Sequence, residues 1–239
     1  MNIAARELHF RDLNDRVRNA REDVRIEGCL GQRFIAAGLS GVNITIDGTP
    51  GNALGAYLNG ANITVNGNAQ DAVGDTMNDG LIEVHGSAGD ALGYAMRGGR
   101  IYVRDGSGYR TGIHMKEYAD KIPVIIVGGA AGSFLGEYLA GGRIIVLGLG
   151  VSGHPPVGNF TGTGMHGGKI FIRCDEGPGS LPAQVSCEKA EAEDLDEIRA
   201  DLADYAQRFA LSLDEIFATP FWVLKPNTQN PYKQLYTKI

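Results

Sequence analysis

Apolar residues recur every 19 positions along the middle of this chain, and within each repeat the apolar positions lie two residues apart. Counted from a recurring glycine, isoleucine stands at the eighth position and valine at the tenth, as in Ile82 and Val84. A two-residue spacing is the period of a β-strand, whereas a helix needs spacings of three and four. Each repeat therefore predicts one short strand. The recurring glycines are Gly55, Gly74, Gly93, Gly112, Gly136 and Gly162.

Seven copies of the repeat cover residues 36 to about 174, with short insertions in the copies that begin at Gly112 and Gly136. Units that repeat at a fixed period of about 20 residues stack into a solenoid. One strand per unit gives a parallel sheet with about 4.8 Å between coils, so seven coils make a rod roughly 34 Å long. The predicted fold class is an all-β solenoid. Because the hexapeptide pattern of left-handed β-helices is absent, we expect a right-handed parallel β-helix, with the six recurring glycines at structural corners.

The flanks of the repeat divide the chain into three parts. Residues 1–35 are expected to form an N-terminal helix over 4–20 and a cap, and the segment from Val24 to Ile26 resembles an incomplete first coil. Such a cap is needed because the end of a β-solenoid exposes an unpaired strand edge. Residues 36–180 form the predicted β-helix.

The C-terminal part, residues 181–239, is expected to contain helices and an aromatic tail. Its first helix carries an apolar stripe, and its second begins with a capping box formed by Ser212 and Glu215. The tail from Thr219 onward has no core of its own and is expected to pack on the solenoid or on a partner. The apolar stripe consists of Leu195, Ile198, Leu202, Tyr205 and Phe209, and the tail contains Phe221, Trp222, Tyr232 and Tyr236.

The ninth position of each repeat lies between the two buried strand residues and is predicted to point outward. In the early coils it is largely compatible with water, but in the last three it holds large apolar residues, Ile126, Ile145 and Phe171. A patch of this kind is seldom exposed on a monomeric protein. We expect it to be covered either by the C-terminal helix or by a partner subunit, and the pattern leaves both alternatives open. The early residues at this position are Thr45, Thr64, Glu83 and Tyr102.

Charge is concentrated in one segment of the chain. Residues 188–204 contain eight acidic and two basic residues, a net charge of −6, which equals the net charge of the whole chain. The remainder is balanced and has no basic stripe, so we expect no binding to nucleic acid. The acidic segment predicts a solvated face of a helix that covers the rod, with an acidic docking surface as the alternative.

Other features bear on location. We expect a cytoplasmic protein without membrane contact, because no apolar run reaches membrane-spanning length and the N-terminus leads into a charged segment. The three cysteines, Cys29, Cys174 and Cys187, are odd in number and widely spaced, which suits a reducing compartment.

Candidate chemistry is sparse. Residues 148–153 match the G-x-G-x-x-G dinucleotide fingerprint after a predicted strand, but His154, Pro155 and Pro156 follow where the fingerprint needs a helix. We therefore expect no nucleotide there. The histidines lack metal-ligand spacing, and no nucleophile with a base or pair of carboxylates stands out. The sequence thus assigns no catalytic, cofactor-binding or metal-binding residue, and we expect that the chain is not catalytic alone.

Three stretches carry a resemblance to a known family. Residues 93–103 read GYAMRGGRIYV and residues 136–146 read GEYLAGGRIIV, which resemble the GXGXG domain at the C-terminal end of the glutamate synthase large subunit. Residues 162–172 (GTGMHGGKIFI) and the ending 230–236 (NPYKQLY) resemble its free-standing form, a separately encoded subunit. The coil is also similar to that of a scaffold subunit of formylmethanofuran dehydrogenase.

The resemblance implies a right-handed β-helix that serves as a structural, scaffold subunit in nitrogen metabolism. Its complex would form glutamate from glutamine and 2-oxoglutarate, with a glutaminase (amidotransferase) subunit and an FMN-binding synthase subunit as partners. FMN and iron–sulfur clusters would be bound by those partners. The alternatives are a scaffold in a formylmethanofuran dehydrogenase and a solenoid enzyme acting on carbohydrate, which would need carboxylates or bases gathered on one outer face. Self-association is a further alternative that the sequence leaves open.

Overall fold

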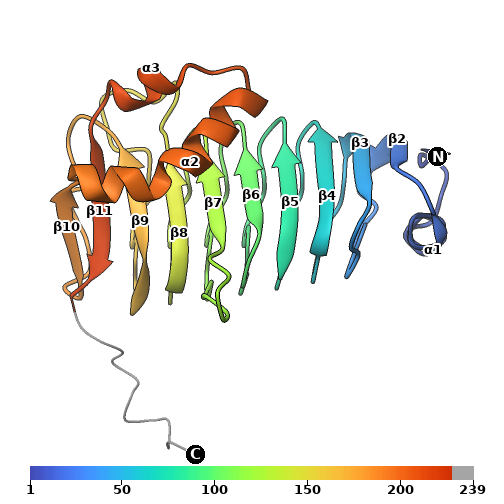
Figure 1. The fold of residues 1–239 in the computed structure, drawn as a ribbon, viewed down its shortest axis with the longest axis horizontal. Helices are drawn as coiled ribbons and strands as arrows, with labels where there is room; N and C mark the ends of the chain where they lie inside the picture. The colour runs from blue at the N-terminus through green and yellow to red at the C-terminus, as the bar shows by residue number, and fades with distance from the viewer. Residues whose placement is uncertain (228–239) are drawn as a thin grey trace, which may run out of the picture.

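The computed structural model describes residues 1–227 of the 239-residue chain. Its strands lie side by side in one 11-stranded sheet that runs the length of the molecule (Figure 1). From β2 to β9 the strands are parallel and follow chain order, one per coil, and the return segments pass behind the sheet, which makes a right-handed β-helix. The coil strands are β2 (Val24–Leu30), β3 (Asn43–Thr49), β4 (Asn59–Asn66), β5 (Asp79–Val84), β6 (Arg100–Val103), β7 (Val124–Val127), β8 (Ala140–Val146) and β9 (Gly167–Arg173).

The predicted register is confirmed along the whole rod. The isoleucines of the eighth repeat position pair from strand to strand and form an unbroken ladder inside the coils, no more than 1% exposed. The tenth position forms a second buried ladder, from Ile46 to Ile172. The β-helix core therefore follows from the two-residue period of the sequence. The isoleucine ladder consists of Ile44, Ile63, Ile82, Ile101, Ile125, Ile144 and Ile170.

Turn segments close each coil opposite the sheet, and the six recurring glycines lie in them. All six have a positive φ, between +64° and +73°. Five of them face the isoleucine ladder so closely that a Cβ would collide with it; at Gly93 it would stand 2.4 Å from Cδ1 of Ile125. These positions therefore require glycine both for its backbone conformation and for its lack of a side chain.

The N-terminal end of the rod differs in detail from the prediction. The helix α1 spans Phe10–Asn19 instead of beginning at residue 4, and Asn2–Ala4 form a strand, β1, that pairs in parallel with β2. Pairing with β1 satisfies the edge of the first coil, which a helix could not do through its backbone. Leu13 and Val17 of α1 are buried in the solenoid core, so α1 contributes apolar contacts at that end.

The C-terminal end continues the sheet beyond residue 180, where the sequence predicted helices and a tail. Strand β11 (Phe221–Pro226) pairs antiparallel with β9, and β10 (Val185–Lys189) pairs antiparallel with β11. The predicted helices are present as α2 (Ala192–Arg208) and α3 (Leu213–Phe217), with the Ser212 hydroxyl accepting from the backbone N–H of Glu215 at 3.3 Å. The tail residues Tyr232 and Tyr236 lie outside the described residues.

Candidate functional site

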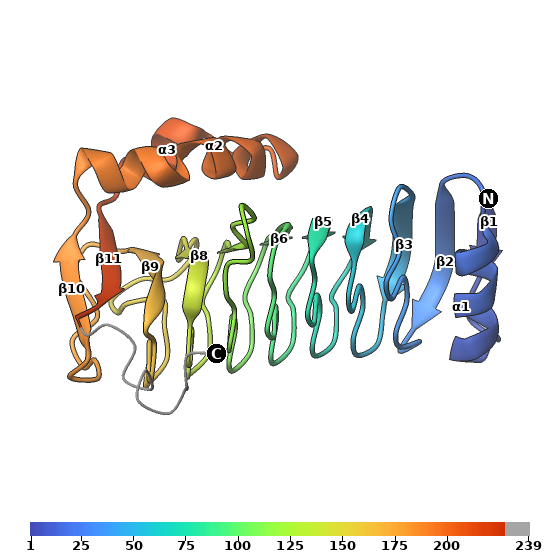
Figure 2. The ribbon, with the colours of Figure 1, turned by 60° about the horizontal axis from the view of Figure 1, so that its bottom comes forward.

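The outer face of the sheet has an open half and a covered half. Helices α2 and α3 lie along one side of the rod, over its C-terminal coils (Figure 2). Ile126, Ile145 and Phe171 are fully buried there, in one cluster with Ile198 and Leu202 of α2. Of the two alternatives for this patch, the structure therefore shows the chain's own helix in place. On the open half, Thr45 and Thr64 are partly exposed.

Several acidic residues of α2 form ion pairs with lysines of the rod. The sequence predicted instead that the acidic side of this helix is a solvated face. Asp194 accepts ion pairs from Lys169 at 3.3 Å and from Lys225 at 2.9 Å, and Glu197 also pairs with Lys169. Burial acts to raise the pKa of Asp194, but the hydrogen bonds from Lys225 and Lys169 and from the backbone hold it below its usual value. These pairs anchor the N-terminal half of α2 to β9 and β11. Its solvent-facing side carries acids such as Glu193 and Asp196.

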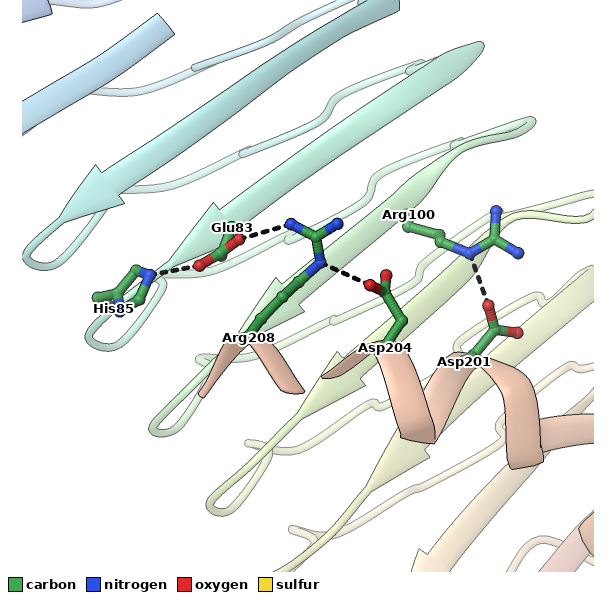
Figure 3. A network of polar contacts seen from close by, with 6 residues as sticks. All are labelled: Glu83, His85, Arg100, Asp201, Asp204 and Arg208. Carbon is green, nitrogen blue, oxygen red and sulfur yellow. Dashed lines mark hydrogen bonds and ion pairs between the residues drawn. The ribbon is translucent and has the colours of Figure 1, made fainter. Parts of the chain in front are cut away.

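A polar network fixes the C-terminal half of α2 (Figure 3). The Arg208 guanidinium lies 3.1 Å from a carboxylate oxygen of Glu83 on β5 and 2.9 Å from one of Asp204. His85 contacts the other oxygen of Glu83, and Arg100 of β6 pairs with Asp201 at 2.6 Å. A groove of about 430 Å³ borders Arg100, Asp201, Asp204 and Arg208. Because each carboxylate is bound by an arginine, the arrangement attaches a helix and offers no ready general base.

The sequence predicted that the ninth position is largely compatible with water in the early coils, but two of its four residues there are buried. The Glu83 side chain is only 8% exposed, and Tyr102 is fully buried, with its ring 5.6 Å from that of Tyr205 in an edge-to-face arrangement. The Tyr205 hydroxyl donates to the carbonyl oxygen of Val103 at 3.0 Å. Helix α2 therefore extends over β5 and β6, further than the apolar pattern of the ninth position indicated.

Replacing Glu83 with alanine is expected to destabilise the fold by about 1–3 kcal/mol, because the partly buried Arg208 and His85 lose a carboxylate partner. The sequence alone predicts an almost silent change. The matched control is Asp105→Ala, which removes an exposed ion pair with Arg104 at 3.0 Å and should cost less than about 1 kcal/mol. Urea unfolding of both variants checks the difference. Equal, near-zero effects would show that Glu83 does not hold α2.

The G-x-G-x-x-G segment borders a cavity of about 390 Å³ at the C-terminal end of the rod. No helix follows the segment; the next described element is β9. Arg173 also lines this cavity, but three of its N–H groups donate to the carbonyl oxygens of Ile216, Leu147 and Glu215, which ties α3 to the coil. The segment therefore lacks the helix N-terminus that a dinucleotide site uses.

Aspartate carboxylates on the turn side of the rod form hydrogen bonds between neighbouring coils. Asp71 accepts from the backbone N–H of Asp90 at 2.9 Å, and Asp90 accepts from that of Tyr109 at 2.8 Å. Each aspartate thus bonds the backbone of the next coil. A glycosidase needs one carboxyl group that protonates and another that attacks or activates water. The Asp71 and Asp90 carboxylates are instead hydrogen-bonded within the fold.

The cysteines and histidines do not gather into a metal site in the part of the chain that the structure describes. No group of three or more His, Cys, Asp or Glu residues able to hold a metal ion occurs among residues 1–227. The three cysteines are free thiols, with Cys29 buried and the others partly buried. Within the same range, no helix has the length and apolar character needed to cross a bilayer.

Alkylation of Cys29 in the folded chain is expected to be at least about a hundredfold slower at pH 8 than in the urea-denatured chain, since the thiolate fraction falls by about that factor. Burial raises the pKa of Cys29 to about 11. Because the folded-state value is the higher one, the thiol favours the folded state below about pH 9 and loses that contribution as the pH rises toward 11. Iodoacetamide labelling followed by mass spectrometry checks this. Equal rates in both states would contradict the burial of Cys29.

Comparison with known proteins agrees with this architecture. Residues 9–219 match the family model described as the GXGXG motif, so the chain belongs to the GXGXG family. It is 39% identical to the uncharacterized protein MJ1350 of Methanocaldococcus jannaschii, over 98% of this chain and 95% of that protein. Among solved structures it is similar to a chain of the formyltransferase/hydrolase complex (FhcABCD) from Methylorubrum extorquens, solved with methylofuran.

The structural similarity has a TM-score of 0.61 at 21% sequence identity, and it covers 84% of this chain and 71% of that one. At this identity the similarity shows a common fold.

Proposed function

We propose that this chain is a non-catalytic scaffold subunit of a multi-subunit enzyme complex. The observation that carries the proposal is the use of its polar side chains: the charged groups of Figure 3 attach α2, and Arg173 attaches α3. Because these charged side chains hold the chain's own helices on the rod, the rod is suited to a structural role, in which it holds other subunits in place. Membership in the GXGXG family supports the same conclusion.

The particular complex we propose is a glutamate synthase that forms glutamate from glutamine and 2-oxoglutarate. Its support is the resemblance of residues 93–103, 136–146 and 162–172 to the free-standing GXGXG subunit. The partners would be a glutaminase subunit and an FMN-binding synthase subunit, and FMN and iron–sulfur clusters would be bound there, in the cytoplasm. This chain would supply the surface on which the two active sites are held together.

A second candidate is a scaffold in a formylmethanofuran dehydrogenase. Among the comparisons, the similarity to a chain of a formyltransferase/hydrolase complex with methylofuran points to this class more directly than to glutamate synthase. Since that similarity lies at 21% identity, it supports the candidate through the fold alone. The two candidates differ in the partners and metals that they require.

Purification of the tagged chain from its source organism distinguishes them. A glutamate synthase should retain a glutaminase subunit, FMN and iron, and should form glutamate from glutamine and 2-oxoglutarate. A formylmethanofuran dehydrogenase should instead retain a subunit containing molybdenum or tungsten. If the chain purifies alone, or if the isolated chain catalyses either reaction, the scaffold proposal is wrong.

A further inference from the structure

The turn segments opposite the sheet carry two regular rows of residues with a left-handed backbone, and in the C-terminal coils their side chains are partly or largely exposed. In each row the backbone N–H of one coil donates to a carbonyl of the next, as from Arg110 to Ser133 and from His114 to Glu137. The residues of both rows have positive φ, between 49° and 62°. This turn face lies away from α2 and α3 (Figure 2). The first row is Phe34, Ala53, Ala72, Ala91, Arg110, Phe134 and Phe160, and the second is Tyr57, Thr76, Ala95, His114 and Tyr138.

Aromatic rings gather on this face over the C-terminal coils. Phe134 and Phe160 stack with ring centroids 5.0 Å apart, and His114 stacks on Tyr138 at 5.1 Å. Phe160 is 57% exposed, and Tyr109, two coils away, is 56% exposed. We call Tyr109, His114, Phe134, Tyr138 and Phe160, together with Tyr94, the aromatic turn patch.

The fold does not require aromatic residues at these positions. Ala53, Ala72 and Ala91 occupy the same row with the same backbone conformation, so a methyl group satisfies it. A bulky residue at positive φ is uncommon because the conformation is strained. The chain nevertheless has Phe134 and Phe160 at these positions, and Phe160 is 57% exposed. Exposed, stacked rings at positions where alanine satisfies the backbone indicate a role in contact with another molecule.

The charge of the patch restricts what that molecule is. Arg110 lies over the Phe134 ring at 5.3 Å and pairs with Glu137 at 3.0 Å, so the two charges cancel within the patch. A surface of Tyr and Phe rings beside one paired arginine has the composition of a protein–protein interface core. It lacks the excess positive charge that would attract nucleic acid or an anionic bilayer.

We propose that the aromatic turn patch is the docking surface for a catalytic partner subunit, which presents an uncharged apolar surface to it. This inference rests on the proposed scaffold function and adds the face by which the chain binds. Helix α2 already covers the C-terminal half of the sheet face, so the turn face is the side of those coils on which a partner contacts the rod directly. The rings would anchor the partner, with Arg110 and Glu137 within the contact.

The test compares two purifications of the complex, one with the tagged wild-type chain and one with the tagged double variant Phe134→Ala/Phe160→Ala. Since alanine already occupies this row, the variant should fold with an unchanged urea midpoint. It should retain less than about a tenth of the partner subunit, as expected for the loss of interface anchors. The matched control is Tyr57→Ala, which removes a ring of equal exposure (58%) and similar φ (58°) several coils away. This control should retain the partner in full.

The outcomes separate the inference from the function on which it rests. Full retention of the partner by the double variant, or equal loss with Tyr57→Ala, overturns the docking surface and leaves the scaffold function standing. Absence of any partner subunit with the wild-type chain overturns both. If the wild-type chain is a dimer that the double variant converts to a monomer while the partner is retained, the patch binds a second copy and the inference is wrong.

Discussion

Replacing Ile145 with aspartate is expected to detach α2 from the rod and to lower the free energy of unfolding by about 3–5 kcal/mol, as for an uncompensated buried charge. Ile145 lies on β8 and is fully buried beneath α2, in the cluster that contains Ile198 and Leu202. Urea unfolding measures the loss of stability. Amide hydrogen exchange shows where it occurs, and α2 should lose protection before the isoleucine ladder does.

The control for this change is Thr45→Asp. Thr45 occupies the same ninth position of its repeat, its side chain is partly exposed on the open half of the sheet, and its neighbours in the register are Arg25 and Thr64. A carboxylate there remains in contact with water, so the change should alter stability by less than about 1 kcal/mol. If Ile145→Asp is as mild as the control, or if it unfolds the rod without releasing α2 first, the covered patch is not what attaches the helix.

Replacing Gly93 with valine is expected to cost at least about 2 kcal/mol, through both backbone strain and overpacking. Its φ is +66°, and a Cβ would stand 2.4 Å from Cδ1 of Ile125. Alanine substitutions at two glycines separate backbone strain from overpacking. Gly38 has a similar φ of +72° but open space around its Cβ position, so Gly38→Ala reports backbone strain alone. Gly93→Ala should be less stable than Gly38→Ala by about 1–3 kcal/mol.

A second substitution tests the proposed clash at Gly93. Ile125→Val removes the Cδ1 atom that a Cβ at residue 93 would meet, so it should recover part of the stability that Gly93→Ala loses. The expected coupling in a double-mutant cycle is about 0.5–3 kcal/mol, as for residues in direct contact. Additive effects of the two changes, measured by urea unfolding, would mean that the glycine is not required by the isoleucine ladder.

The sequence predicted the rod because its information is local and repeated. Ile82 and Val84 specify a strand within three residues, and the 19-residue period then fixes which residues pair between coils. The turn glycines were visible for the same reason. The apolar change at the ninth position also predicted a covered patch, although the pattern did not decide between the helix and a partner.

The sequence did not reveal contacts between segments that lie far apart in the chain. Glu83 looks like a surface residue in its own repeat, and it becomes buried only because Arg208, 125 residues later, reaches it. The pairing of β1 with β2 and of β11 with β9 likewise depends on strand edges that exist only after the coils have stacked. The aromatic turn patch was missed because its side chains are spread over three repeats. Alignment of the repeats by their recurring glycines would have shown the change from alanine to phenylalanine two residues before the glycine.

The scaffold account is tested most directly by deleting the chain from its source organism and measuring whether the catalytic partner subunits still migrate together on native gel filtration. The account predicts that each partner remains folded and present but elutes separately, and that adding back the wild-type chain restores the shared peak. Co-elution and full activity of the partners without the chain would contradict it.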